Sequence, residues 1–222
     1  MAFANGGQIV TSGLVLALDA ADRNSYVSGS TTWSDISGNG NTGTLTNGPT
    51  FDGGNGGSIL FDGTNDYVQN SNTSFNYSNI SISTWIRRDT TSTTFSVIIS
   101  KESASTGWIL HIINTNKIYW KINGSDATAT TSLSSLTAGV WYYITSTYNG
   151  SQLAVYINSV LDNTSNNNSG IVSNSATIRI GEYQTTGNAF KGNIANIQIY
   201  NRALTTTEIL QNYNATKTRF GL

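Results

Sequence analysis

Residues 141–163, WYYITSTYNGSQLAVYINSVLDN, decide the fold class of this chain. Asn149 and Gly150 separate two runs rich in β-branched and aromatic residues, and these two residue types best tolerate the positive φ angles of a type I′ turn. In the second run, alternate residues from Leu153 to Ile157 point to one face and those between them to the other, which is the two-residue period of a strand. The stretch therefore predicts a β-hairpin.

The same alternation recurs along the chain, in SISTWIR, FSVIIS, WILHII, KIYWKI, ATIRIG and NIANIQIY. Stretches rich in Gly and Asn separate these runs, as is typical of β-sandwiches. A second tight turn is predicted at Asn158 and Ser159, where Ser in place of Gly adds left-handed strain. Thr205 and Glu208 form a capping box ahead of apolar residues, which predicts a helix. We therefore predict an all-β, two-sheet antiparallel sandwich with one short C-terminal helix.

The polarity of the chain comes from uncharged residues. Only 10 % of its 222 residues are charged, the formal net charge is −1, and cysteine is absent. Lys and Arg are scattered, so no basic footprint for nucleic acid forms, and no apolar run approaches the roughly 20 residues that cross a bilayer. We expect no nucleic-acid partner, no membrane insertion and no disulfide or thiolate chemistry.

Residues that could carry catalysis are sparse. His111 is the single histidine, and it lies in a strand-like run without a nucleophile-elbow motif, so we expect it to pack or to face solvent. Glycoside hydrolysis needs two carboxylates about 5 to 9 Å apart, whereas the acidic residues here are spread singly. We therefore predict that the chain is not an enzyme, with hydrolysis through long-range pairing of carboxylates as the lesser alternative.

The segment FDGTNDYV offers the best local metal candidate. Asp62, Asn65 and Asp66 flank a turn that could fold their oxygens together, and such hard oxygen ligands suit Ca²⁺. The alternative is that Asp62 and Asp66 only hydrogen-bond their own turn. No cofactor is required by the sequence, and calcium is the candidate ion.

Aromatic side chains are candidates for carbohydrate contacts, because flat rings match the apolar faces of pyranose sugars. Most of them occur in strand patterns, and we expect Trp85, Trp120 and Trp141 to be buried. Tyr183 and Trp108 lie next to loop signals. These two residues are therefore the predicted exposed carbohydrate contacts.

The segments GLVLALDAADRNSY, TWSDISGNGNTGTLTNGPTF and ILFDGTNDYV together resemble the beginning of the concanavalin A-like, laminin-G-type jelly rolls. The similarity runs to IYNRALTTTEILQNYN and covers residues 13–214. It implies an antiparallel jelly-roll domain at residues 14–214, in which residues 35–41 form a structural loop at the sandwich edge. Relatives often carry acidic residues where this chain has Ala195 and Asn196, which counts against calcium.

The N-terminal GGQIVTSGLVLALDAADRNSY and the C-terminal NATKTRFGL resemble the versions of this domain found in virion proteins of tailed bacteriophages. The resemblance implies a non-enzymatic structural protein on the virion surface, as a head decoration, fibre or tail-associated protein assembled in the host cytoplasm. Residues 1–13 would then be an arm that anchors to other virion proteins, and residues 215–222 a tail. A homo-oligomer is expected, because virion appendages are symmetric. The alternative function is a glycan-binding module that attaches to host-surface sugars.

Overall fold

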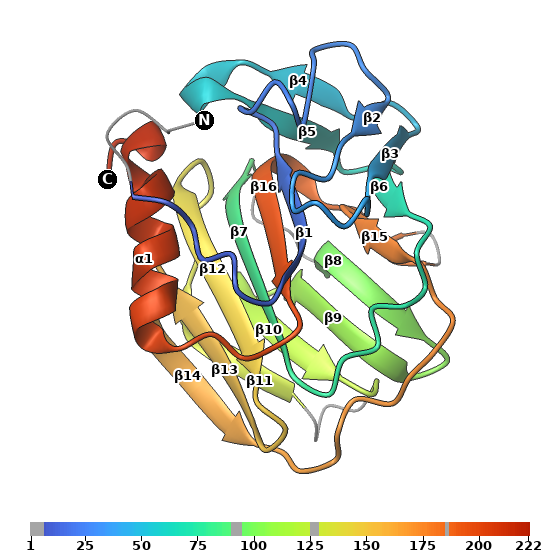
Figure 1. Ribbon diagram of the computed structural model, residues 1–222, viewed down its shortest axis with the longest axis vertical. Helices are drawn as coiled ribbons and strands as arrows, with labels where there is room; N and C mark the ends of the chain where they lie inside the picture. The colour runs from blue at the N-terminus through green and yellow to red at the C-terminus, as the bar shows by residue number, and fades with distance from the viewer. Residues whose placement is uncertain (1–6, 90–94, 125–128, 185–186) are drawn as a thin grey trace.

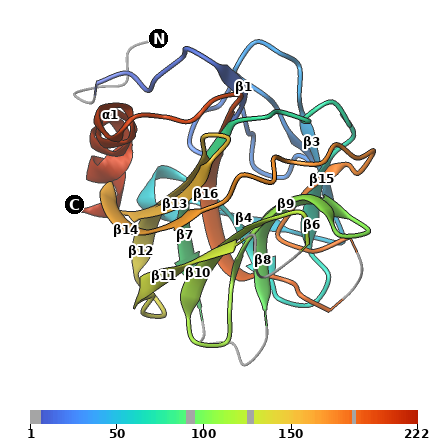
Figure 2. The same cartoon turned by 90° about the horizontal axis from the view of Figure 1, so that it is seen from below.

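The computed structural model describes residues 7–89, 95–124, 129–184 and 187–222. Two antiparallel sheets pack face to face, and one helix, α1 (Thr206–Thr216), lies on the outside of one of them (Figure 1). Figure 2 shows α1 on one side of the β12–β13–β14 layer and strands β8 to β11 on the other. The predicted all-β sandwich with one short C-terminal helix is confirmed.

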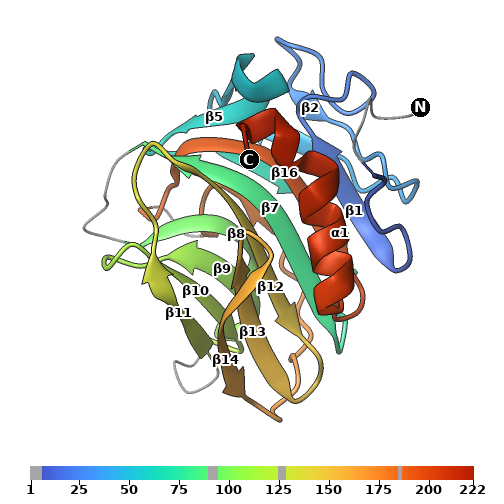
Figure 3. The same cartoon turned by 90° about the vertical axis from the view of Figure 1, so that its left-hand side faces the viewer.

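The sheet beneath the helix, called here the helix sheet, runs in the order β14-β13-β12-β7-β16-β5-β4, with β1 also paired to β16. On one edge β16 pairs with β7, and on the other it pairs first with β5 and then with β1. Segments far apart in sequence therefore lie side by side around β16 (Figure 3). Its strands are β1 (Leu14–Asp19), β4 (Thr50–Asp52), β5 (Ser58–Asp62), β7 (Ile80–Arg88), β12 (Trp141–Tyr148), β13 (Gln152–Ile157), β14 (Val160–Asn166) and β16 (Lys191–Tyr200).

The second sheet, called here the open sheet, runs in the order β11-β10-β9-β8-β15-β6-β3-β2. No described helix covers its outer face. Its strands are β2 (Thr32–Trp33), β3 (Gly43–Thr46), β6 (Tyr67–Asn70), β8 (Ser96–Ser103), β9 (Thr106–Ile112), β10 (Lys117–Ile122), β11 (Ala129–Ser135) and β15 (Ile178–Ile180). Two short 3₁₀ turns, η1 (Gly54–Gly56) and η3 (Lys217–Phe220), complete the fold.

The predicted hairpin joins β12 to β13, but its turn differs from the prediction. Tyr148 pairs with Leu153, so residues 149–152 lie between the paired positions. Gly150 has a φ of 93°, whereas Asn149 is not among the residues with positive φ. The Asn149 side chain instead accepts the backbone N–H of residues 151 and 152. The hairpin is therefore confirmed, and the type I′ geometry is wrong because the amide side chain closes a wider loop.

The second predicted turn has the geometry that was expected of the first. Ile157 pairs with Val160, which leaves a two-residue connection between β13 and β14. Both connecting residues have left-handed φ angles, 50° at Asn158 and 67° at Ser159. The left-handed strain predicted at Ser159 is therefore present.

Strand β13 is buried on both faces, because the helix covers the face that the sandwich core does not. Leu153 and Val155 belong to the core between the sheets. Ala154 and Tyr156 belong to a second apolar cluster beneath α1. The predicted alternation is confirmed.

The loop at residues 35–41 holds the free edge of β1. The Asp35 carboxylate accepts the backbone N–H of Ala17 at 2.9 Å, and the Asn41 amide donates to the carbonyl of Val15 at 2.7 Å. The same carboxylate accepts the backbone N–H of Asn41. As predicted, this is a structural loop, and its polar side chains satisfy a neighbouring strand as well as its own backbone.

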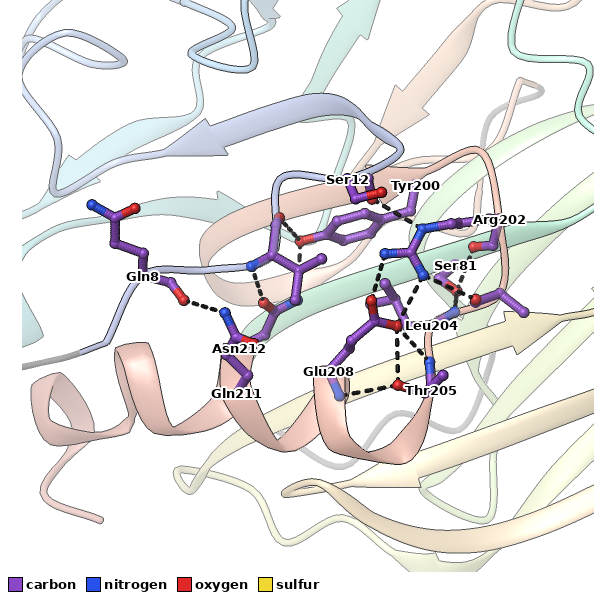
Figure 4. Close-up of polar contacts among 12 residues, drawn as sticks. Gln8, Ser12, Ser81, Tyr200, Arg202, Leu204, Thr205, Glu208, Gln211 and Asn212 are labelled. Carbon is purple, nitrogen blue, oxygen red and sulfur yellow. Dashed lines mark hydrogen bonds and ion pairs between the residues drawn. The ribbon is translucent and has the colours of Figure 1, made fainter.

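Both ends of the described chain pack against the domain. The Val10 N–H donates to the Asn212 side chain at 2.7 Å, and the Tyr200 hydroxyl donates to the Val10 carbonyl at 3.0 Å (Figure 4). At the other end, the Phe220 ring stacks on Trp85 with centroids 4.1 Å apart. Val10 and Phe220 are both buried, so the boundaries predicted at residues 13 and 215 do not separate the ends from the core. Residues 1–6 of the predicted arm lie outside the described residues.

Candidate functional site

A groove of about 500 Å³ lies on the outer face of the open sheet, across β8, β9 and β10. Alternation along β9 creates it: Trp108, Leu110 and Ile112 point into the core between the sheets. Ile109 and His111 point the other way and line the groove. The groove floor is therefore a strand surface, which holds its side chains rigidly.

Aromatic rings cover one part of this floor. The His111 ring stacks on Tyr119, with centroids 4.9 Å apart and planes within 9°. The Phe95 ring is tilted against His111, with centroids 5.2 Å apart, and it remains 52 % exposed. His111 and Tyr119 cover each other's faces, so Phe95 is the ring that the groove leaves open. An exposed ring of this kind suits the C–H face of a sugar.

Charged groups occupy the neighbouring part of the floor. The Lys121 ammonium lies 3.5 Å from the Glu102 carboxylate, and the Glu102 side chain is only 5 % exposed. The Tyr183 side chain lines the groove near the same carboxylate. Burial, followed by the charge of Glu102, raises the pKa of Tyr183, so its hydroxyl stays protonated at neutral pH. The groove therefore offers a carboxylate acceptor beside ammonium and phenol donors.

A second ion pair positions Tyr183. The Arg179 guanidinium lies over the Tyr67 ring at 4.2 Å and is 3.6 Å from the Glu182 carboxylate. It also donates to the Tyr183 carbonyl at 3.1 Å. Burial raises the pKa of Glu182, while the charge of Arg179 opposes that rise. The backbone that carries Tyr183 is thus tied to β15.

Trp108, the other predicted carbohydrate contact, is in the core. Its side chain is only 1 % exposed, and its ring lies 6.3 Å from that of Trp120 between the sheets. The predicted exposure is wrong, because the strand alternation turns Trp108 inward. Trp85 and Trp120 are buried as predicted, whereas Trp141 is only half-buried.

The three predicted calcium ligands lie apart from the groove, around the turn between β5 and β6. Asp62 accepts the backbone N–H of Thr64 at 2.7 Å, and Asp66 accepts that of Asp62 at 2.9 Å. The Asn65 carbonyl accepts the Asn47 side chain at 2.9 Å. These bonds match the turn-forming alternative. Within the described part of the chain, no three acidic, histidine or cysteine side chains are grouped to hold a metal, and calcium stays a prediction.

Most of the groove was not predicted from the sequence. Tyr119 and Lys121 alternate with Ile118, Trp120 and Ile122 along β10, so the polar face of this strand was visible in KIYWKI. Nothing in the sequence indicated that this face would meet the end of β8 and the loop of Tyr183. The alternation in the sequence indicated the polar face of β10. The order of the strands, which decides which side chains lie beside that face, could not be predicted from it.

The sequence matches the model of a known protein family. The family model described as the concanavalin A-like lectin/glucanases superfamily matches residues 62–210. The chain belongs to this superfamily. No curated protein matches it by sequence, and the described residues include no helix with the length and apolarity to cross a membrane.

Solved structures with the same jelly roll include the receptor binding domain of a botulinum neurotoxin C/D mosaic serotype, with a TM-score of 0.72 and 20 % identity over 92 % of this chain. Another is domain 4 of AbnA, a GH43 extracellular arabinanase from Geobacillus stearothermophilus, in complex with arabinotriose, with a TM-score of 0.72 and 17 % identity. The match covers 91 % of this chain and 98 % of that domain.

A third is botulinum neurotoxin type C, whose cell entry depends on interaction with two ganglioside molecules, with a TM-score of 0.70 and 19 % identity over 92 % of this chain. The chain spans about half the length of these neurotoxin structures, 51 % in both cases. At such identities the likeness establishes the jelly-roll fold.

Proposed function

We propose that this jelly roll is a non-enzymatic glycan-binding module whose site is the groove on the open sheet. The observation that carries the proposal is that the exposed Phe95 ring, which rests against His111, lines the same groove as the Glu102–Lys121 ion pair. Stacking rings and paired hydrogen-bonding groups are what a sugar requires. The neighbouring folds add support, because the arabinanase domain holds arabinotriose and the type C neurotoxin uses gangliosides.

The number of carboxylates in the groove supports binding without hydrolysis. Among its described lining residues, Glu102 is the one carboxylate, and it is paired with Lys121. Glycoside hydrolysis needs a second carboxylate on the other side of the sugar. The module therefore holds the glycan without cleaving it, and prolonged incubation of bacterial polysaccharide at high protein concentration should release no sugar.

The module is displayed on the surface of a tailed-phage particle, where it attaches to host-surface glycans. The resemblance of both chain ends to virion proteins supports this placement, and the low charge limits unspecific adhesion. Other virion proteins anchor it through the N-terminal arm, and it is a homo-oligomer. Immunogold labelling of purified particles tests the placement: label on heads, fibres or tails supports it, and unlabelled particles contradict it.

Substitution of Tyr183 tests the glycan site. Tyr183→Ala removes a half-buried ring and a groove hydroxyl, so affinity for a bound glycan should fall at least tenfold while the fold is retained. Tyr183→Phe keeps the ring and should retain most of the affinity if stacking is the main contact. Titration calorimetry measures both variants, and circular dichroism checks the fold. Unchanged binding by Tyr183→Ala would exclude this groove as the site.

A further inference from the structure

The groove floor is divided into two rows by the strand register. In the first row Val97 pairs with His111, which pairs with Tyr119. In the second row Ile109 pairs with Ser100 and Lys121. Glu102 lies beyond this row, opposite Gly107, and its carboxylate reaches Lys121. Because the rows are two residues apart along each strand, they are separated by about 6.6 Å. This spacing matches the width of one sugar ring, so a single ring contacts an aromatic row and a charged row together.

The first row is more apolar than an unsubstituted sugar requires. Val97 belongs to this row and Ile109 to the next, and Ile113 and the exposed Phe95 line the same groove. Aromatic rings alone satisfy the C–H face of a hexose. Contact between an aliphatic side chain and a sugar hydroxyl adds little binding free energy, whereas burial of a methyl group against that side chain is favourable.

The charges of the groove are already balanced by protein partners. Among the described lining residues the charged ones are Glu102 and Lys121, and they are paired with each other. A charged ligand would add a third charge to this balanced pair and leave one charge uncompensated in a partly buried site. A neutral ligand hydrogen-bonds to both members of a pair and leaves the pair intact.

We infer that the groove selects neutral sugars that carry a methyl group, either in an N-acetyl substituent or as a 6-deoxy carbon. The methyl group lies on the aliphatic part of the floor, and the ring hydroxyls bind Glu102 and Lys121. This inference rests on the proposed glycan-binding function and specifies its ligand class. It also implies that binding depends only weakly on salt, because the ligand carries no charge to screen.

Matched ligand pairs test the inference. The first pair is chitotriose against cellotriose, which differ in their N-acetyl groups, and the second is L-fucose against L-galactose, which differ at carbon 6. Calorimetric titration of the full chain should give roughly tenfold tighter binding for the methyl-bearing member of at least one pair, the usual effect of one methyl group in an apolar pocket. The pair that responds identifies the source of the methyl group.

Ile113→Thr provides the matched variant, since it replaces aliphatic surface with a hydroxyl at a half-buried position. It should reduce the preference within the responding pair to less than about threefold. Val172→Thr makes the same kind of change at an exposed site outside the groove and should leave the preference intact. Thermal unfolding of both variants checks that the fold is unchanged.

Three outcomes overturn the inference in distinguishable ways. Equal affinity for both members of each pair, or tighter binding of a sialylated or uronic-acid sugar, would refute the selectivity and leave glycan binding standing. Binding of no glycan from a broad array would refute the proposed function itself. An unchanged preference in Ile113→Thr would show that the methyl group lies elsewhere.

Discussion

Arg219 joins the C-terminal 3₁₀ turn to the first strand, and its removal tests whether the predicted tail is part of the core. Its guanidinium donates to both oxygens of Asp19 at 2.9 Å, to the carbonyl of Gly57 at 3.0 Å and to the carbonyl of Asn55 at 3.3 Å. Arg219→Ala removes all four bonds. Asp19 is only 9 % exposed. The substitution therefore leaves a buried carboxylate without its cation.

The expected loss is about 3 kcal/mol of unfolding free energy at pH 7, at the lower end for a broken buried pair because Arg219 keeps some solvent contact. For a chain of this length the loss corresponds to a fall in Tm of roughly 6 to 12 °C. Burial raises the pKa of Asp19, and Arg219 opposes that rise. Without Arg219 the pKa rises further.

The pH dependence has a definite sign. A carboxyl group whose pKa is raised in the folded state binds its proton more tightly there than in the unfolded chain, so lower pH stabilises the variant. The loss of unfolding free energy caused by Arg219→Ala should therefore become smaller as the pH falls from 7 to 4.5. Urea unfolding at several pH values measures it.

Lys217→Ala is the matched control, because the ammonium of this residue on the same turn lies 5.3 Å from the centre of the Tyr213 ring and forms no ion pair with the described residues. It should cost no more than about 1 kcal/mol. A loss below 1 kcal/mol in Arg219→Ala, or a deficit that does not change with pH, would refute the reasoning.

Three further predictions concern the helix, its 3₁₀ extension and one turn. Phe220→Ala should lower the unfolding free energy by about 3 to 5 kcal/mol, because it opens a cavity beside Trp85; chemical denaturation measures this, and a loss under 1 kcal/mol would contradict the packing. The Arg202 guanidinium lowers the pKa of Glu208 to about 2, so the stabilisation from this carboxylate is full above its usual pKa of 4.5 and is lost as the pH falls towards 2. Glu208→Gln should flatten that part of the acid-unfolding curve, and an equally steep curve would argue against the ion pair. Ser159→Gly should raise stability by about 0.5 kcal/mol, since glycine adopts the positive φ with less strain; a lower Tm would count against this account.

Local patterns predicted the long strands, the hairpins and the helix correctly. They failed at Asn149, where a side-chain hydrogen bond competes with a tight backbone turn. At Asn149 the side chain closes the loop itself, so the Asn-Gly pair did not form a two-residue turn. At Asn158 and Ser159, by contrast, the backbone adopts the predicted left-handed turn in spite of its strain. Sequence alone did not give the loop length at Asn149, because the pairing of β13 with β12 sets it.

The prediction for Trp108 was wrong for a similar reason. WILHII carries large apolar residues on both faces, so its alternation does not say which face enters the core. The choice depends on the opposing sheet, which is built from residues distant in the chain. Trp108 was therefore assigned to the surface, whereas its neighbours Ile109 and His111 line the groove.

The sequence by itself determined the long strands, the positions of the hairpins and the start of α1, because hydrophobic alternation and the bonds between Thr205 and Glu208 act over a few residues. Only the tertiary structure decided where the groove lies. It brings together Glu102 from β8, Lys121 from β10 on the far side of β9, and Tyr183 from a distant loop. The physical reason is that burial against the opposite sheet fixes which strand face is outward, and long-range strand order fixes which side chains meet there.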